Sequence, residues 1–158
     1  MTLNNIKTMK KERGFTIVEL LIVIVVIGIL AAIVIVAFNG VQNKAKTTKA
    51  QTNAAAVQKV AEAYNADNSV YPGTIANFGA ATTVKLPTGV TVVSAAATPF
   101  GLTASNGDTS VSYQYKGASA TTATGGRIQF WDFSTPGVSG TVIYVGNAAS
   151  GDTFAQAL

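Results

Sequence analysis

The sequence predicts an α+β fold, in which one long N-terminal helix packs its second half on a small antiparallel β-sheet. Three observations predict it. Residues 20–38 are uncharged and predominantly apolar, and residues 41–66 contain neither Pro nor Gly. From about residue 90 onward, short runs of alternating apolar and polar residues are separated by turn-forming pairs such as Asn106-Gly107.

The uncharged run is long enough to cross a membrane as a helix. Its 19 residues span roughly 28 Å at about 1.5 Å per residue, close to the ~30 Å hydrocarbon core of a bilayer. The preceding segment is basic, which favours a cytoplasmic N-terminus; it contains Lys7, Lys10, Lys11 and Arg13. We therefore expect residues 15–40 to form a single transmembrane helix, with the remainder of the chain outside the cytoplasm.

Residues 41–158 are expected to form one globular domain. Its first part, residues 41–66, is an amphipathic helix, because four apolar residues fall at positions i, i+3, i+4 and i+7 of one face: Val57, Val60, Ala61 and Tyr64. A loop over residues 67–88 follows, since Tyr71-Pro72-Gly73 forbids a continuing helix. The β-sheet and the C-terminal region are expected over residues 89–158.

The strands of this sheet are expected at residues 90–94, 111–116, 127–133 and 141–145. Val111, Tyr113 and Tyr115 alternate with polar residues, which predicts a strand with one buried and one exposed face. Gly125-Gly126 predicts a turn. Residues 146–158 are expected to be a loop that Phe154 and Leu158 anchor to the domain.

A specific motif stands at the start of the apolar run. A basic segment ends in Gly14, Phe15 follows, and a single carboxylate, Glu19, lies four residues further on. A carboxylate at the edge of a membrane span is costly, which indicates a function. The pattern resembles the class III signal peptide of type IV pilins and pseudopilins, where a basic leader ending in Gly precedes Phe and then Thr-Leu/Ile-x-Glu-Leu-Leu.

The resemblance implies how such a chain matures and assembles. Residues 1–14 are then a prepilin leader peptide, which a prepilin peptidase removes by cutting between Gly14 and Phe15 before the new N-terminus of Phe15 is methylated. The ammonium group of Phe15 and the carboxylate of Glu19 then act in subunit assembly. A neighbour's ammonium group offsets the cost of a carboxylate buried in a fibre core, and the helix macrodipole favours an anion in the first turn.

Two other interpretations of the N-terminus remain open. The first is an ordinary secretory signal cleaved after Ala37, although its apolar segment exceeds the usual ~7–15 residues. The second is a plain single-pass anchor with an incidental Glu19.

The chain also departs from many pilins: it has no Cys to close a C-terminal loop, and Val36 stands where many have a Pro.

The composition argues against an enzyme and against several kinds of binding site. Without His or Cys, Ser-His-Asp and Cys-His arrangements are impossible, and no Gly-rich phosphate loop is present, so we expect no catalytic residues and no cofactor. Asp108, Asp132 and Asp152 lie near turns without the D-x-[DN]-x-[DN]-G spacing, which favours turn formers over calcium ligands, so no metal site is expected. Beyond residue 14 there are 7 basic and 6 acidic residues, a balance that gives no case for nucleic acid.

The first functional hypothesis is a structural pilin of a type IV pilus fibre, which supports adhesion, motility or DNA uptake. Its partners are then other copies and other pilins, prepilin peptidase, the inner-membrane assembly platform and membrane lipid, whose headgroups Lys44, Lys46 and Lys49 can reach. It would lie in the cytoplasmic membrane before assembly and in an extracellular pilus afterwards. The alternatives are a pseudopilin of a type II secretion or competence system, and a membrane-tethered binding module that does not polymerise.

Overall fold

The computed structural model describes residues 14–81, 83–94 and 101–156. Two sequence predictions lie outside the described residues, namely the leader over residues 1–13 and the anchoring role of Leu158. The chain divides into two compact units, Met1–Asn39 and Gly40–Leu158.

Helix α1 covers Ile17–Asn68. It continues through Asn39-Gly40, as predicted, and ends two residues beyond the expected boundary, where Ser69 adopts a positive φ of 59°. Within the first unit, the large apolar side chains between residues 15 and 38 are all exposed. Among the described residues, α1 is the one helix that is long and apolar enough to cross a membrane by length and composition.

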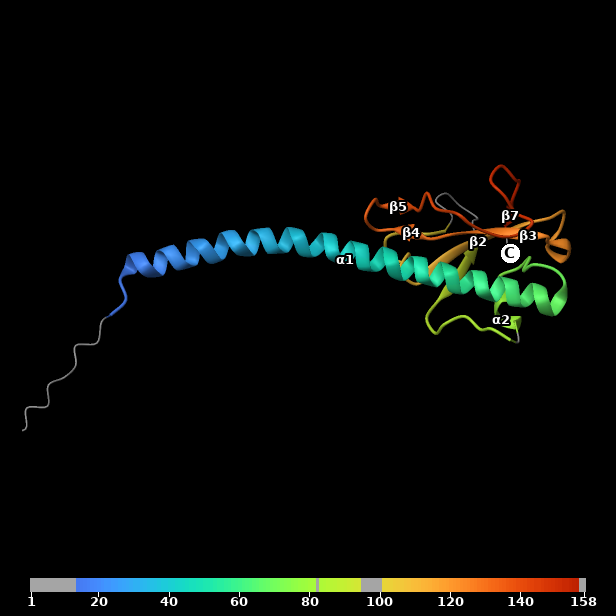
Figure 1. The fold of residues 1–158 in the computed structure, drawn as a ribbon, viewed down its shortest axis with the longest axis horizontal. Coiled ribbons are helices and arrows are strands. Elements are labelled where there is room, and N and C mark those ends of the chain that lie inside the picture. The colour runs from blue at the N-terminus through green and yellow to red at the C-terminus, as the bar shows by residue number, and fades with distance from the viewer. Residues whose placement is uncertain (1–13, 82, 95–100, 157–158) are drawn as a thin grey trace, which may run out of the picture. The chain divides into compact units, whose positions relative to one another are not determined.

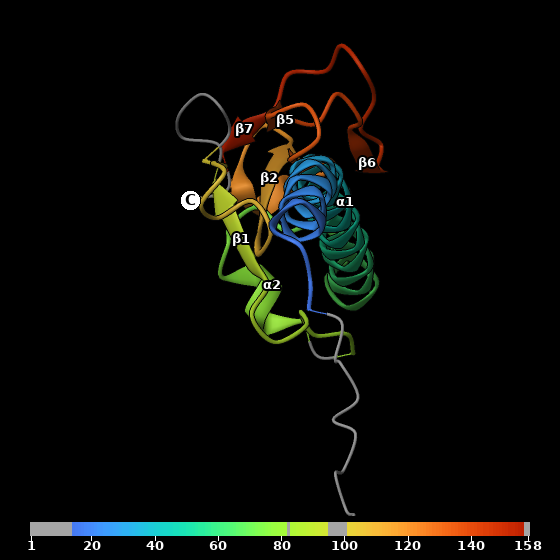
Figure 2. The same cartoon turned by 90° about the vertical axis from the view of Figure 1, so that its left-hand side faces the viewer.

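Within the second unit, one face of α1 packs on the sheet. The side chains on this face are fully buried: Ala50, Ala54, Val57, Val60 and Ala61. They join one apolar core with residues of the sheet, namely Val111, Tyr113, Ile128 and Val145. Figure 1 and Figure 2 both place the strands along one side of this part of α1. The predicted helix face is therefore confirmed, with Tyr64 partly buried at its edge.

The main sheet has the strand order β1-β2-β3-β6, with β7 also paired to β2. Its members are β1 (Thr91–Ser94), β2 (Ser110–Lys116), β3 (Gly125–Gln129), β6 (Ile143–Gly146) and β7 (Ala155–Gln156). The expected antiparallel pairing holds for β2 with β3 and for β3 with β6. Strand β7, which was not predicted, also runs antiparallel to β2. Strand β1 runs parallel to β2, so the sheet is mixed. The connection over residues 95–109 is long enough for the crossover that parallel strands require.

Three smaller features were not predicted. A short helix, α2 (Asn77–Ala80), lies in the expected loop and buries Phe78. A 3₁₀ turn, η1 (Ala120–Thr122), follows β2. A second sheet pairs β4 (Trp131–Asp132) with β5 (Gly137–Val138), so the strand expected over residues 127–133 is interrupted at Phe130.

The predicted turn at Gly125-Gly126 is wrong, because both residues belong to β3. The hydroxyl oxygen of buried Tyr113 lies only 2.5 Å from where a Cβ on Gly126 would be. Glycine is needed here for space beside Tyr113, and the chain reverses instead over residues 117–124, between β2 and β3.

The prediction that β2 has one exposed face is also wrong, since Ser112 and Gln114 on its second face are buried. The C-terminal segment covers part of that face. The ring of Phe154 lies 4.7 Å from the guanidinium carbon of Arg127 and 6.2 Å from the ring of Tyr144. The anchoring role expected for Phe154 is thus confirmed, and the loop expected over residues 146–158 contains β7.

Candidate functional site: the start of helix α1

The predicted cleavage position lies just before α1. Residues 14–16 are not helical, and the helix begins at Ile17. The side chain of Phe15 is 90% exposed, and a Cβ placed on Gly14 would meet no heavy atom within 4 Å. The Gly14–Phe15 peptide bond is therefore open to another protein, which is what a peptidase substrate requires.

Thr16 and Glu19 together cap the first turn of α1. The backbone N–H and the hydroxyl group of Thr16 both donate to Oε2 of Glu19 at 2.8 Å. In return, the backbone N–H of Glu19 donates to Oγ1 of Thr16 at 3.2 Å. This is a capping box, which satisfies backbone donors that a helix N-terminus otherwise leaves unpaired. The sequence prediction for Glu19 concerned its charge alone; the Thr-x-x-Glu spacing is the signal that predicts the box.

The surroundings of Glu19 are apolar. Phe15, Leu20, Val23 and Ile24 line a shallow groove beside it. In the part of the chain that the structure describes, no basic side chain lies within ion-pair distance of its carboxylate. The carboxylate therefore has local hydrogen-bond donors but no counter-charge from the described residues of its own chain.

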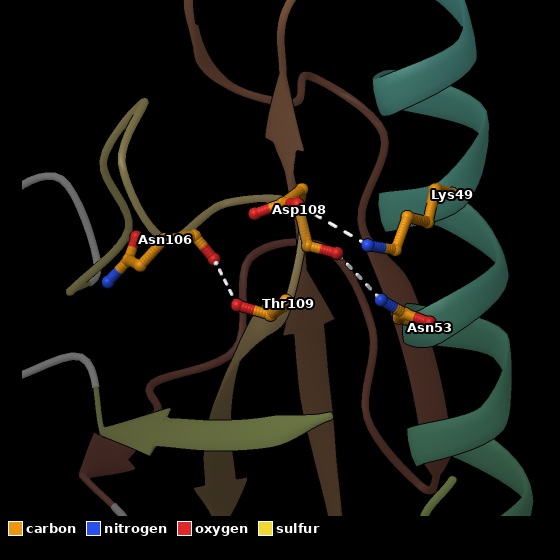
Figure 3. Close-up of polar contacts among 5 residues, drawn as sticks. All are labelled: Lys49, Asn53, Asn106, Asp108 and Thr109. Atoms are coloured by element: carbon orange, nitrogen blue, oxygen red, sulfur yellow. Dashed lines mark hydrogen bonds and ion pairs between the residues drawn. The ribbon is translucent and has the colours of Figure 1, made fainter. Parts of the chain in front are cut away.

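The three predicted turn carboxylates of the second unit are each bound by their own chain. Asp108 forms an ion pair with Lys49 at 3.3 Å, and its backbone carbonyl accepts a hydrogen bond from Asn53 at 3.0 Å, so two residues of α1 hold this loop (Figure 3). Asp132 accepts hydrogen bonds from Thr47, Ser134 and Thr135. Asp152 pairs with Lys116 at 2.9 Å.

These contacts set the ionisation of two of the carboxylates. Burial disfavours the charged form of Asp132, but its hydrogen bonds from Thr135, Ser134 and Thr47 outweigh burial and lower its pKa. The hydrogen bond from Lys116, followed by that from the backbone of Ala149, lowers the pKa of Asp152. Within the described residues, no three acidic side chains gather in a group that could hold a metal ion.

The three lysines that follow the apolar run differ in their surroundings. Lys49 is engaged by Asp108, as described above, and the Nζ atom of Lys46 lies 5.5 Å from the ring centre of Phe133. Lys44 is exposed, and none of the ion pairs among the described residues involves it.

An exposed Gly-Phe bond, a capped carboxylate four residues beyond Phe15 and an uninterrupted exposed apolar helix define a prepilin-type N-terminus. The sequence pattern of the prokaryotic N-terminal methylation motif matches residues 9–35 of the chain, a range that contains Gly14, Phe15 and Glu19.

The chain is also homologous to proteins named type II secretion system core protein G. That of Vibrio cholerae serotype O1 is 43% identical over 68 residues, 43% of this chain and 47% of the relative. That of Dickeya chrysanthemi is 39% identical over 79 residues, 50% of each chain. That of Escherichia coli strain K12 is 40% identical over 78 residues, 49% of this chain and 52% of the relative.

These matches confirm the resemblance to pilin-like proteins. The chain spans about half the length of the curated relatives it matches. No solved structure matches it.

Proposed function

We propose that this chain is a pseudopilin, a membrane-anchored structural subunit of a short pilus-like assembly. A prepilin peptidase cuts it after Gly14 and methylates Phe15, and the subunit then assembles through the apolar part of α1 with other copies and other pilin-like subunits. It acts as a substrate and a building block, not as an enzyme. The observation that carries this proposal is the exposed Gly14–Phe15 bond ahead of Glu19, supported by the similarity to type II secretion core protein G.

The geometry supports a sequence of steps. Before assembly, the apolar part of α1 lies in the cytoplasmic membrane, where its exposed side chains contact lipid. Cleavage creates an ammonium group on Phe15, which the carboxylate of a neighbour's Glu19 can bind in an apolar interior. Breaking a fully buried charge pair by removing one partner costs roughly 3–5 kcal/mol. The pair therefore fixes how neighbouring subunits align.

A second candidate, a subunit of an extracellular type IV pilus, shares the same anchor and the same processing. One observation keeps this candidate open: the stretches that match these relatives cover only 43–50% of this chain. The similarity therefore assigns no function to the remaining residues. An extracellular location belongs to this candidate alone, since a pseudopilus stays in the cell envelope.

The test is fractionation of cells that produce the chain, with crosslinking of the envelope. A pseudopilin gives a ladder of crosslinked oligomers that stays in the envelope and little protein in sheared medium. Abundant protein in sheared filaments would favour the pilus subunit instead. A membrane-bound monomer without any ladder would contradict both and leave a tethered binding module.

A further inference from the structure

Helix α1 in the second unit carries exposed opposite charges at a repeated spacing. Lys44 and Glu62 are 18 residues apart, and so are Lys49 and Asp67. Eighteen residues are about five turns of α-helix, or roughly 27 Å. The two members of each pair therefore lie on the same face, and all four residues are exposed.

Nothing in the described sheet covers the face that carries Lys44 and Glu62. At 100° per residue, both positions lie about 140° around the helix from buried Val57, in agreement with their exposure. The hydroxyl group of Tyr71 donates to Oε2 of Glu62 at 2.7 Å, which holds the carboxylate in place. Lys44 has no part in the ion pairs of the described residues.

We propose that this face is an interface with a second copy of the chain, displaced by about five turns along α1, so that Lys44 of one copy meets Glu62 of the next. The inference rests on the proposed function, because it requires parallel copies that turn the same face towards a common axis. Under that displacement, Lys49 also comes level with Asp67, but this second pair lies about 140° around the helix from the first and outside the proposed interface. Without that displacement, Lys44 of one copy would lie level with Lys44 of the other, and Glu62 with Glu62. Like-charge repulsion disfavours that alignment.

The Lys44–Glu62 pair is expected to determine the axial alignment of two copies more than the affinity between them. A single exposed ion pair contributes little to binding, but charges that flank parallel helices select one alignment over others. The interface is therefore expected to set the offset between copies that lie about five turns apart, a different pair of neighbours from those that the Phe15–Glu19 contact joins about one turn apart, while the apolar part of α1 supplies most of the attraction. Lys44–Glu62 is the pair to test, since Lys49 already contacts Asp108.

The first experiment uses the full chain, which has no native Cys. The double variant Lys44→Cys/Glu62→Cys, treated in membranes with a short bis-maleimide, should give a ladder of oligomers. Each single Cys variant should give at most a dimer. A double variant that gives no more than the single variants would overturn the interface, provided that the wild-type chain still sediments as an assembly. Failure of the wild type to assemble would instead contradict the proposed function.

The second experiment exchanges the charges. Lys44→Glu and Glu62→Lys should each lower the assembled fraction about fivefold, as expected when an attractive pair becomes repulsive, and the double exchange should restore it. Lys85→Glu, which makes the same charge change at an exposed site outside α1, is the matched control and should have no effect. Thermal melting curves, and the amount of each variant in the membrane, show whether a substitution has unfolded the chain.

One outcome of the exchange would replace the second copy with lipid. In that outcome, Lys44→Glu weakens binding to vesicles of anionic lipid, and the double exchange restores neither that binding nor assembly. Lys44 then binds lipid headgroups, and the proposed interface is wrong. Restoration of assembly by the double exchange supports the proposed interface.

Discussion

The two units of the chain place their apolar side chains in opposite ways. In the described part of the first unit, large apolar side chains are between 48% and 90% exposed. In the described part of the second, Val41 is the one large apolar side chain that is exposed; the others are buried or partly buried, and many of them form a shared core. The second unit can therefore be stable in water, whereas the first requires lipid or other subunits to cover it.

This contrast predicts that substitutions in one unit leave the other intact. A change in the core of the second unit should unfold that unit without affecting membrane insertion. A change at the start of α1 should affect processing or assembly without affecting the core.

The largest effect on the stability of the second unit is expected from Gly126→Ala. The added Cβ would lie 2.5 Å from the hydroxyl oxygen and 2.6 Å from ring carbons of fully buried Tyr113, and overpacking of this kind typically costs about 1–3 kcal/mol and occasionally more. Thermal unfolding should show a clear fall in Tm, with unchanged membrane insertion.

Gly140→Ala is the matched control, because a Cβ there would meet nothing within 4 Å. If both variants melt like the wild type, the close packing of Gly126 on Tyr113 is not as described.

Glu19→Ala should spare the fold of the second unit and reduce assembly. The carboxylate that we propose binds a neighbour's ammonium group is removed, while insertion into the membrane becomes easier. Glu19→Gln separates charge from capping, since an amide oxygen can still accept the hydrogen bonds from Thr16 but carries no charge. The ratio of crosslinked oligomer to total membrane-bound chain measures the effect. Normal ratios for both variants would show that Glu19 has no role in assembly.

A smaller effect is expected where Lys116 holds the C-terminal segment. Its Nζ atom pairs with Asp152 at 2.9 Å and donates to the backbone carbonyl of Asn147 at 2.5 Å, so it links β2 to a segment that no disulfide closes. Because the pKa of Asp152 is lowered in the folded state, the pair contributes stability above the unfolded-state pKa of about 3.9. That contribution is lost as the pH falls through the folded-state pKa.

The pH dependence gives the measurement. Asp152→Asn should lower Tm at neutral pH, and the difference from the wild type should disappear as the pH falls from about 4 towards 2. A difference that stays constant over this range would mean that the ion pair is not its source.

The smallest effect is expected from Thr16→Ala. Loss of an N-cap side chain typically costs about 1 kcal/mol of helix stability, here confined to the first turn of α1. Assembly should fall slightly and far less than with Glu19→Ala, since the charge remains. Hydrogen exchange of the backbone N–H groups of the first turn, measured in detergent, should be faster. Protection equal to that of the wild type would contradict the capping box.

Local patterns predicted much of this fold. The uncharged run over residues 20–38 and the spacing of Val57, Val60 and Ala61 each report on neighbouring positions of a single helix. The structure confirms a helix over the run and a buried face at the spaced residues. The candidate site at Gly14, Phe15 and Glu19 could be proposed for the same reason, since its motif is contiguous.

Predictions were wrong where distant residues decide the structure. Gly125-Gly126 has the composition of a turn, but Tyr113, in another strand, requires the space that Gly126 leaves. Alternation indicates which face of a strand is buried and not its direction, so the parallel pairing of β1 could not be predicted. Ala155 and Gln156 form too short a strand for any period to show.

The most direct test of the central claim is the N-terminus of the mature chain. Intact mass and N-terminal sequencing of the protein purified from membranes should show a chain that begins at Phe15, with a methyl group on its amine. This result is expected because the Gly14–Phe15 bond is exposed and precedes the capped start of α1. A chain that begins at Met1, or at Phe38 after cleavage behind Ala37, would contradict the account.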